Sequence, residues 1–139
     1  MLEYSGSRMI RATRVAISDI LGDISRLPEW NPAILAVTTT DAAAVAGKEY
    51  SLRARLPGSS TMTYDEVSRQ HVVWRLDGFQ AHETGEWTLG RVTEHLTEVT
   101  HTITHSGMVL RILSGAFRAV PGLRLDRLQI RAESGELGR

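Results

Sequence analysis

The sequence contains no cysteine, and its positive and negative charges cancel. Without cysteine the chain has no disulfide, no thiolate nucleophile and no Cys-ligated metal site. Lys and Arg number 16, as do Asp and Glu, so the formal net charge of zero gives no field that would favour nucleic acid or an anionic membrane. These absences direct attention to small, neutral partners.

Long apolar runs are missing too. The N-terminal segment Met1–Arg8 lacks the apolar core of a signal peptide, and no segment approaches the ~20 apolar residues of a membrane helix. We therefore expect a cytoplasmic protein that does not insert into membranes. The 139 residues, of which 42% are hydrophobic, are expected to form one domain with one core, spanning residues 1–139.

Motifs of metal, nucleotide and serine-hydrolase sites are also absent. The sequence has no G-x-S-x-G, no Walker loop, no G-x-G-x-x-G and no H-E-x-x-H. His101 and His105 are four residues apart, but they lie in a strand-like segment where four residues span ~13 Å. Since two ligating nitrogens must each lie ~2 Å from one zinc ion, we predict no metal site here. No organic cofactor is expected either.

Helical spacing of apolar residues marks a first segment, Thr13–Leu27. Pro28 and Pro32 close it, because proline fixes φ and lacks an N–H group. Trp30 lies between the two prolines and is expected to anchor a tight turn. The sequence thus predicts a short amphipathic helix followed by an aromatic-anchored passage.

The second helical segment is Met108–Glu133, which Pro121-Gly122 is expected to kink or split. A partly alternating strand over Leu123–Ile130 is the alternative for its second half. Because acidic residues dilute the charge and the chain is neutral, a solvated helix face is preferred over a nucleic-acid or membrane surface for its five arginines. These are Arg111, Arg118, Arg124, Arg127 and Arg131.

Between the two helical segments, short runs rich in Val, Thr, Tyr and Trp alternate with Gly, Pro-Gly and Asp-Gly turns. A first strand ends near Ala12. Six more strands are predicted at Ile34–Thr40, Lys48–Leu56, Ser60–Ser68, Val72–Leu76, Ala81–Arg91 and Leu96–His105. This order is typical of an antiparallel meander with helices at both ends.

Two segments carry a family resemblance. Asp23–Pro32 resembles the helix-to-strand passage of the START-like (SRPBCC) superfamily, in which an acidic residue precedes a Trp and a Pro by a short interval. Glu86–Leu89 followed by Thr97–Thr100 resembles its penultimate hairpin, with Leu96 where the family usually has Gly. The resemblance covers nearly the whole chain.

The resemblance implies an α+β, helix-grip fold, in which a curved antiparallel sheet of about seven strands wraps around a long C-terminal helix and encloses a cavity. The superfamily includes polyketide cyclases/dehydratases, aromatases and lipid-transfer proteins. Because these motifs are structural and shared by members with unrelated activities, they do not name a ligand.

Strand alternation predicts which side chains face that cavity. In the last strand the outward set is Glu98, Thr100, Thr102 and Thr104, and the inward set is Val99, His101, Ile103 and His105. By the same rule the inward residues of the preceding strand are Trp87, Gly85 and Glu83. Met62, Tyr64 and Glu66 are preferred over Thr63, Asp65 and Val67 as an inward set, partly because the family often has cavity aromatics there. The choice between Trp74 and Val73/Arg75 stays open.

The inward set places titratable groups in a low-dielectric space, where burial raises the pKa of a carboxylic acid and lowers that of a histidine. Candidates for acid–base catalysis are His101, His105, Tyr64 and Glu66. Candidates for ligand contact are Trp87, Trp30, Met62, Ile103, Glu83, Ile112 and Phe117. Each has a plainer interpretation as well: a satisfied core histidine, a rim carboxylate or a space-filling tryptophan.

We therefore expect a small hydrophobic or polyketide-like ligand in an internal cavity. If the protein is an enzyme, it is a polyketide cyclase/aromatase-like lyase or isomerase that works by acid–base chemistry. The alternatives are a non-catalytic carrier or sensor of lipid-like molecules and a chaperone-activator-type protein-interaction module. The sequence leaves open the ligand, the presence of any reaction and the choice between monomer and homodimer.

Overall fold

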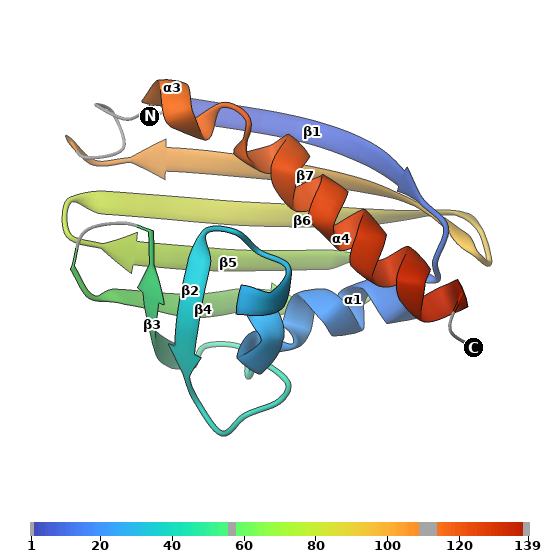
Figure 1. Cartoon of the computed structure of the whole chain (residues 1–139), viewed down its shortest axis with the longest axis horizontal. Helices are drawn as coiled ribbons and strands as arrows, with labels where there is room; N and C mark the ends of the chain where they lie inside the picture. Colours follow the sequence, from blue (N-terminus) through green and yellow to red (C-terminus); the bar gives the residue numbers. More distant parts are fainter. Residues whose placement is uncertain (1, 56–57, 109–113, 138–139) are drawn as a thin grey trace.

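The computed structural model describes residues 2–55, 58–108 and 114–137 (Figure 1). Seven strands form one antiparallel sheet in the order β1-β7-β6-β5-β4-β3-β2. Their bounds are β1 Leu2–Ile10, β2 Ile34–Thr38, β3 Glu49–Ala54, β4 Ser60–Val67, β5 His71–Gly78, β6 Ala81–Thr93 and β7 Leu96–Ser106. All seven predicted strands are present, and from β2 to β7 each pairs with the next along the chain.

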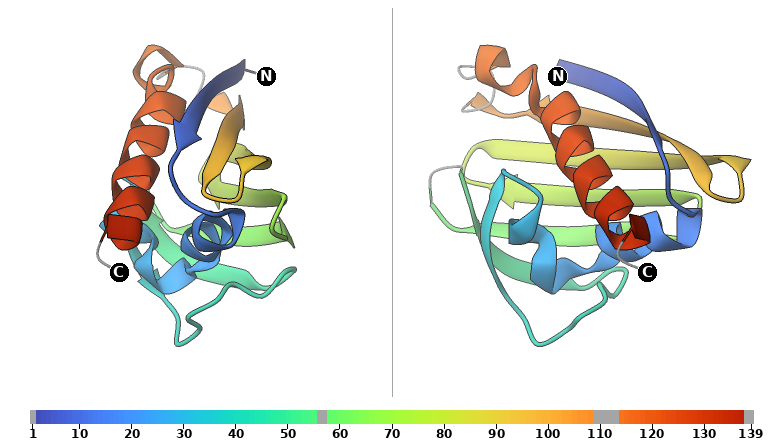
Figure 2. Two further views of the ribbon diagram at one scale, coloured as in Figure 1. Left: turned by 90° about the vertical axis from the view of Figure 1, so that its right-hand side faces the viewer. Right: turned by 45° about the vertical axis from the view of Figure 1, so that its right-hand side comes forward.

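The helices lie together on the concave side of this sheet (Figure 2). They are α1 Arg14–Gly22, the 3₁₀ helix η1 Ile24–Glu29, α3 Ser114–Phe117 and α4 Val120–Leu137. Figure 1 shows α4 crossing the sheet obliquely, while α1 and η1 cover one end of it. The predicted helix-grip architecture is confirmed.

The N-terminal helical segment is divided. Thr13 caps α1 by accepting a hydrogen bond from the backbone N–H of Ala16 at 3.1 Å. The helix ends at Gly22, and η1 then continues as far as Glu29, through Pro28. The predicted apolar periodicity is correct, but the break after Gly22 and the extension past Pro28 were not predicted.

The C-terminal segment is split as predicted, but the break lies between Phe117 and Val120 and not at Pro121-Gly122, which belongs to α4. Pro121 lies in the first turn of α4. Backbone N–H groups in this turn have no acceptor within the helix, so a proline there costs no helical hydrogen bond. The proline therefore starts α4 instead of bending it, and the alternative of a strand over Leu123–Ile130 was wrong. Leu125, Leu128 and Ala132 form the buried stripe of α4.

Burial alternates along β7 as predicted. The inner face carries four buried residues: Val99, His101, Ile103 and His105. The residues that alternate with them lie on the outer face: Glu98, Thr100, Thr102 and Thr104. There the hydroxyl groups of Ser5 and Thr102 approach to 2.9 Å, as do those of Ser7 and Thr100. Trp74 is fully buried on the inner face, which settles the choice that the sequence left open.

A β-bulge changes the alternation in β4. The pairing register with β5 shifts between Tyr64 and Glu66, so Asp65 is an extra residue on this strand. Met62 and Tyr64 face inward as predicted, but after the bulge Glu66 is exposed and its Oε2 lies 2.8 Å from Nδ1 of His71. The prediction that Glu66 faces the interior was therefore wrong.

Candidate functional site

An ion pair is buried between the sheet and α4. Glu83 of β6 and Arg124 of α4 are 5% and 1% exposed. Two parallel hydrogen bonds join them: Arg124 Nη1 donates to Glu83 Oε2 at 2.9 Å, and Nη2 donates to Oε1 at 3.0 Å. This bidentate pair ties α4 to β6.

Two neighbours complete the surroundings of Glu83. Trp74 Nε1 donates to Oε2 at 3.1 Å, and His105 Nε2 lies 3.2 Å from Oε1. Burial by itself raises the pKa of Glu83, but the charge of Arg124 and the hydrogen bonds outweigh it and hold that pKa well below its usual range. The expectation that burial brings this carboxyl toward neutrality was wrong, because its buried partner is a cation.

His101 is held as a neutral imidazole. Its ring stacks on Trp87 with centroids 3.6 Å apart and planes 12° apart. Nδ1 donates to the carbonyl oxygen of Glu86 at 3.0 Å, so Nε2 is the atom that accepts from Arg124 Nη1 at 3.2 Å. Burial, reinforced by the Arg124 charge, lowers the pKa of His101 to about 3, as expected in direction. Both ring nitrogens are therefore occupied.

His105 differs from His101 because one of its nitrogens is available. With Nε2–H donating to Glu83, Nδ1 carries the lone pair, and it has no hydrogen-bond partner among the described residues. Nε of Arg124 is also buried and unpartnered within the same residues. The ring of Phe117 from α3 stands edge-on to His105 with centroids 5.1 Å apart. An acceptor and a donor thus remain unused beside an aromatic side chain.

A narrow space adjoins this ion pair. Its volume is about 30 Å³, enough for one or two water molecules. The ion pair forms part of its wall, and the remaining lining residues are mostly apolar: Ala33, Ala54, Arg55, Leu76, Phe117 and Val120. Arg124 and the core tryptophans occupy the region where the sequence led us to expect a ligand-sized cavity. In the part of the chain that the structure describes, the space under α4 is closed.

The other candidate residues lie in different places. Tyr64 donates its hydroxyl to the carbonyl oxygen of Leu21 at 2.6 Å, and burial raises its pKa, so it links β4 to α1. Met62 and Ile103 are buried in the core, and Trp30 lines a separate surface cleft. Ile112 falls outside the described residues. Phe117 does line the narrow space.

Sequence reasoning missed Arg124, which it assigned to the solvated face of the helix. The signal was its spacing: Arg124, Leu128 and Ala132 are successive fourth residues, so they lie on one stripe of a helix. Trp74 was left undecided, and its position depends on Gly85 opposite, where an added Cβ would overlap the Trp74 indole. In both cases tertiary pairing, not local pattern, decides the position.

The described residues contain neither a membrane-spanning helix nor a metal-binding cluster. No helix there is long and apolar enough to cross a membrane. No group of three or more His, Cys, Asp or Glu side chains within the described ranges is arranged to hold a metal ion. The Glu83–Arg124 cluster, with its unpartnered buried atoms, is the candidate functional site.

No protein-family model matches the chain, and no curated protein matches it. Among solved structures, the chain is similar to a START superfamily protein from Mycobacterium smegmatis, with a TM-score of 0.73 and 14% identity over 95% of this chain and 97% of that one. The protein has a START-like fold.

START-like neighbours with a stated activity are also similar to it. One is the Zhui aromatase/cyclase from Streptomyces, with a TM-score of 0.69 and 14% identity over 95% of this chain and 93% of that one. Another is the di-domain aromatase/cyclase BexL, with a TM-score of 0.73 and 13% identity over 96% of this chain and 47% of that one. At such identities the likeness establishes the START-like fold alone, and function has to be argued from the chain's own residues.

Proposed function

We propose that this START-like domain binds a small, mostly apolar, uncharged molecule between its sheet and α4. The observation that carries the proposal is the narrow space beside Phe117 and Val120, whose mostly apolar wall also includes the Glu83–Arg124 pair. Ligand sites typically combine an apolar lining with a few polar groups that fix orientation. That two proteins of similar fold are aromatase/cyclases supports the proposal of a polyketide-like ligand.

The ligand reaches this site by displacing side chains at the start of α4. Phe117 lies in the short helix α3, and Val120 is the first residue of α4, so both are held by few helical hydrogen bonds. Arg124 lies one turn further along and is tied to Glu83 by two hydrogen bonds. Opening therefore moves Phe117 and Val120 while the ion pair keeps α4 on the sheet.

The unused polar atoms define the ligand's polar group. Arg124 Nε is a donor and His105 Nδ1 an acceptor. A hydroxyl or carbonyl oxygen of the ligand accepts from Arg124, which lines the space, whereas His105 contacts Phe117 but is not part of the lining. An anionic group is disfavoured because Glu83 already neutralises Arg124 and a second buried negative charge would have no partner. A phenol, enol or carbonyl group on an apolar body fits best.

Catalysis is a second candidate, favoured by one observation. Glu83 accepts the Nε2–H of His105, which leaves the lone pair of the ring on Nδ1, the atom that a general base would use. His101 and Tyr64 have their polar atoms committed to Arg124, Glu86 and Leu21. A cyclisation or dehydration would thus depend on His105 as the proton acceptor. A protein that carries the ligand without reacting with it needs the binding site but no proton acceptor.

Native mass spectrometry of freshly purified protein tests the proposal. A co-purifying small molecule with an apolar body is expected, and it should be lost in Val120→Phe, whose larger side chain fills the narrow space. The matched control is Leu123→Phe, an exposed position on the same helix that does not line the space. A ligand that survives Val120→Phe, or protein that stays free of ligand when incubated with 2-naphthol, would refute interior binding.

A further inference from the structure

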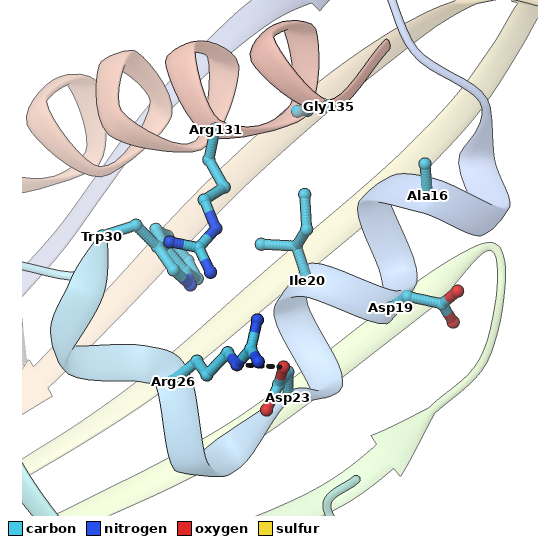
Figure 3. A pocket seen from close by; sticks show the side chains of 9 residues that line it. Ala16, Asp19, Ile20, Asp23, Arg26, Trp30, Arg131 and Gly135 are labelled. Carbon is cyan, nitrogen blue, oxygen red and sulfur yellow. Dashed lines mark ion pairs between the residues drawn. The ribbon is translucent and has the colours of Figure 1, made fainter. Parts of the chain in front are cut away.

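A second, larger hollow lies on the outside of the molecule. It is a cleft of about 280 Å³ between α1, η1 and the C-terminal half of α4 (Figure 3). This volume is just below the ~300–1,000 Å³ typical of small-molecule sites. The cleft shares no lining residue with the narrow space under α4. A separate ligand could occupy it without entering the interior.

Two arginines line the cleft from different elements. Figure 3 shows the guanidinium groups of Arg26, from η1, and Arg131, from α4, turned toward the same space. Arg131 Nη1 donates to Glu29 at 2.8 Å, whereas Arg26 Nε is 3.8 Å from the nearer Asp23 oxygen, beyond hydrogen-bond range. A guanidinium has five N–H donors, so each retains donors for a ligand.

Trp30 adds an independent sign of a ligand. It lines the cleft and is 3% exposed, yet its indole N–H has no acceptor among the described residues. A buried donor without an acceptor is disfavoured. The indole also packs edge-on against Trp87, with ring centroids 5.9 Å apart. The residues that line the cleft thus carry three donor groups, of which the indole N–H is itself buried.

The remaining lining limits the class of ligand. Ile20, Ala16 and Ala132 offer a small apolar surface for the body of the ligand. Three carboxylates lie near the arginines: Asp19 and Asp23 line the cleft, and Glu29 pairs with Arg131 and lies 4.0 Å from Arg26. They would repel a ligand that carries a second negative charge. The donors therefore suit a monoanion with two acceptor oxygens, the geometry that a guanidinium binds bidentately. A dianionic phosphate matches this charge balance less well.

We propose that this cleft is a second binding site, for a small organic carboxylate with a compact apolar body. The carboxylate lies between Arg26 and Arg131 and accepts from the indole N–H of Trp30. The body rests on Ile20 and the alanines of α1 and α4. This site is independent of the proposed interior function, because its donors and its ligand charge are different.

NMR of the three indole N–H groups tests this site, with the Trp30 signal assigned by Trp30→Phe. Benzoate is expected to shift the Trp30 signal in a saturable way, and benzamide, its uncharged counterpart, to bind at least about tenfold more weakly. Arg131→Gln should weaken benzoate binding by a similar factor. Arg127→Gln, an exposed change on the same helix outside the cleft, should leave it unaltered.

Several results would overturn the proposal. Equal binding of benzamide would show that the charge is not recognised, and tighter binding of phenylphosphate would contradict the monoanion argument. A benzoate shift confined to Trp74 or Trp87 would place the ligand in the interior. Unchanged affinity in Arg131→Gln, with a native amide spectrum, would remove the arginine from the site.

Discussion

Replacing Arg124 by methionine is the sharpest perturbation of the buried cluster. Methionine keeps much of the volume of the side chain but leaves Glu83 charged, 5% exposed and without a cation. Breaking one side of a buried ion pair costs about 3–5 kcal/mol. Glu83→Gln strands the guanidinium instead and should cost a similar amount. We expect each single variant to lose that much free energy of unfolding in urea at pH 7.

The double variant Glu83→Gln/Arg124→Met separates this account from simple loss of packing. It removes both charges, while the Gln oxygen still accepts from Trp74. We therefore expect its loss of free energy of unfolding to be smaller than the sum of the two single losses by at least about 2 kcal/mol. Single variants that each cost less than about 1 kcal/mol, or additive costs in the double variant, would refute the reasoning.

The pH dependence of stability is a second test of Arg124→Met. In the wild type the pKa of Glu83 is lower in the folded state than in the unfolded chain. The charged Glu83 therefore stabilises the fold at pH values above its pKa in the unfolded chain, and this stabilisation is lost as the pH falls below that pKa. Without Arg124, burial is opposed only by the hydrogen bonds from Trp74 and His105, and we expect it to raise that pKa. The sign then reverses, and Glu83 destabilises the fold more as pH rises. The cost of Arg124→Met should therefore shrink between pH 7 and about pH 4.

Three further predictions concern single residues. The pKa of His101 is about 3 in the fold, so wild-type stability should fall as pH drops from about 6.5 toward 3, and His101→Gln should flatten that loss in a urea series. Gly85→Ala should cost about 1–3 kcal/mol by thermal unfolding, because its Cβ would overlap Trp74, whereas Gly90→Ala, with its nearest contact at 3.7 Å, should cost less. Tyr64→Phe should cost about 1–2 kcal/mol, since a buried carbonyl of α1 loses its donor, yet leave 2-naphthol binding by calorimetry unchanged.

The sheet and its faces could be predicted because strand alternation has a fixed period. In β7 the imidazoles of His101 and His105 share the inner face with Val99 and Ile103. Trp87 and Glu83 follow by the same rule in β6. Where the period is interrupted, the prediction fails, as at Glu66, because one extra residue in β4 reverses the direction of those that follow.

The chemistry of the site depends on contacts that the local sequence does not contain. Glu83 and Arg124 are 41 residues apart, and their pairing determines both the low pKa of Glu83 and the place of Arg124 inside the fold. A rule that charged residues face solvent put Arg124 outside, although its helical spacing from Leu128 pointed inward. The Arg124 side chain also fills the expected cavity, whose size depends on how closely α4 packs on the sheet.

The most direct test of interior binding follows the Nε–H proton of Arg124 by NMR. This proton is buried and unpartnered among the described residues. We predict that 2-naphthol shifts its signal in a saturable, single-site titration and that naphthalene, which lacks the hydroxyl group, shifts it far less. An Arg124 signal that does not move at saturating 2-naphthol, or moves equally with naphthalene, would contradict the proposed site.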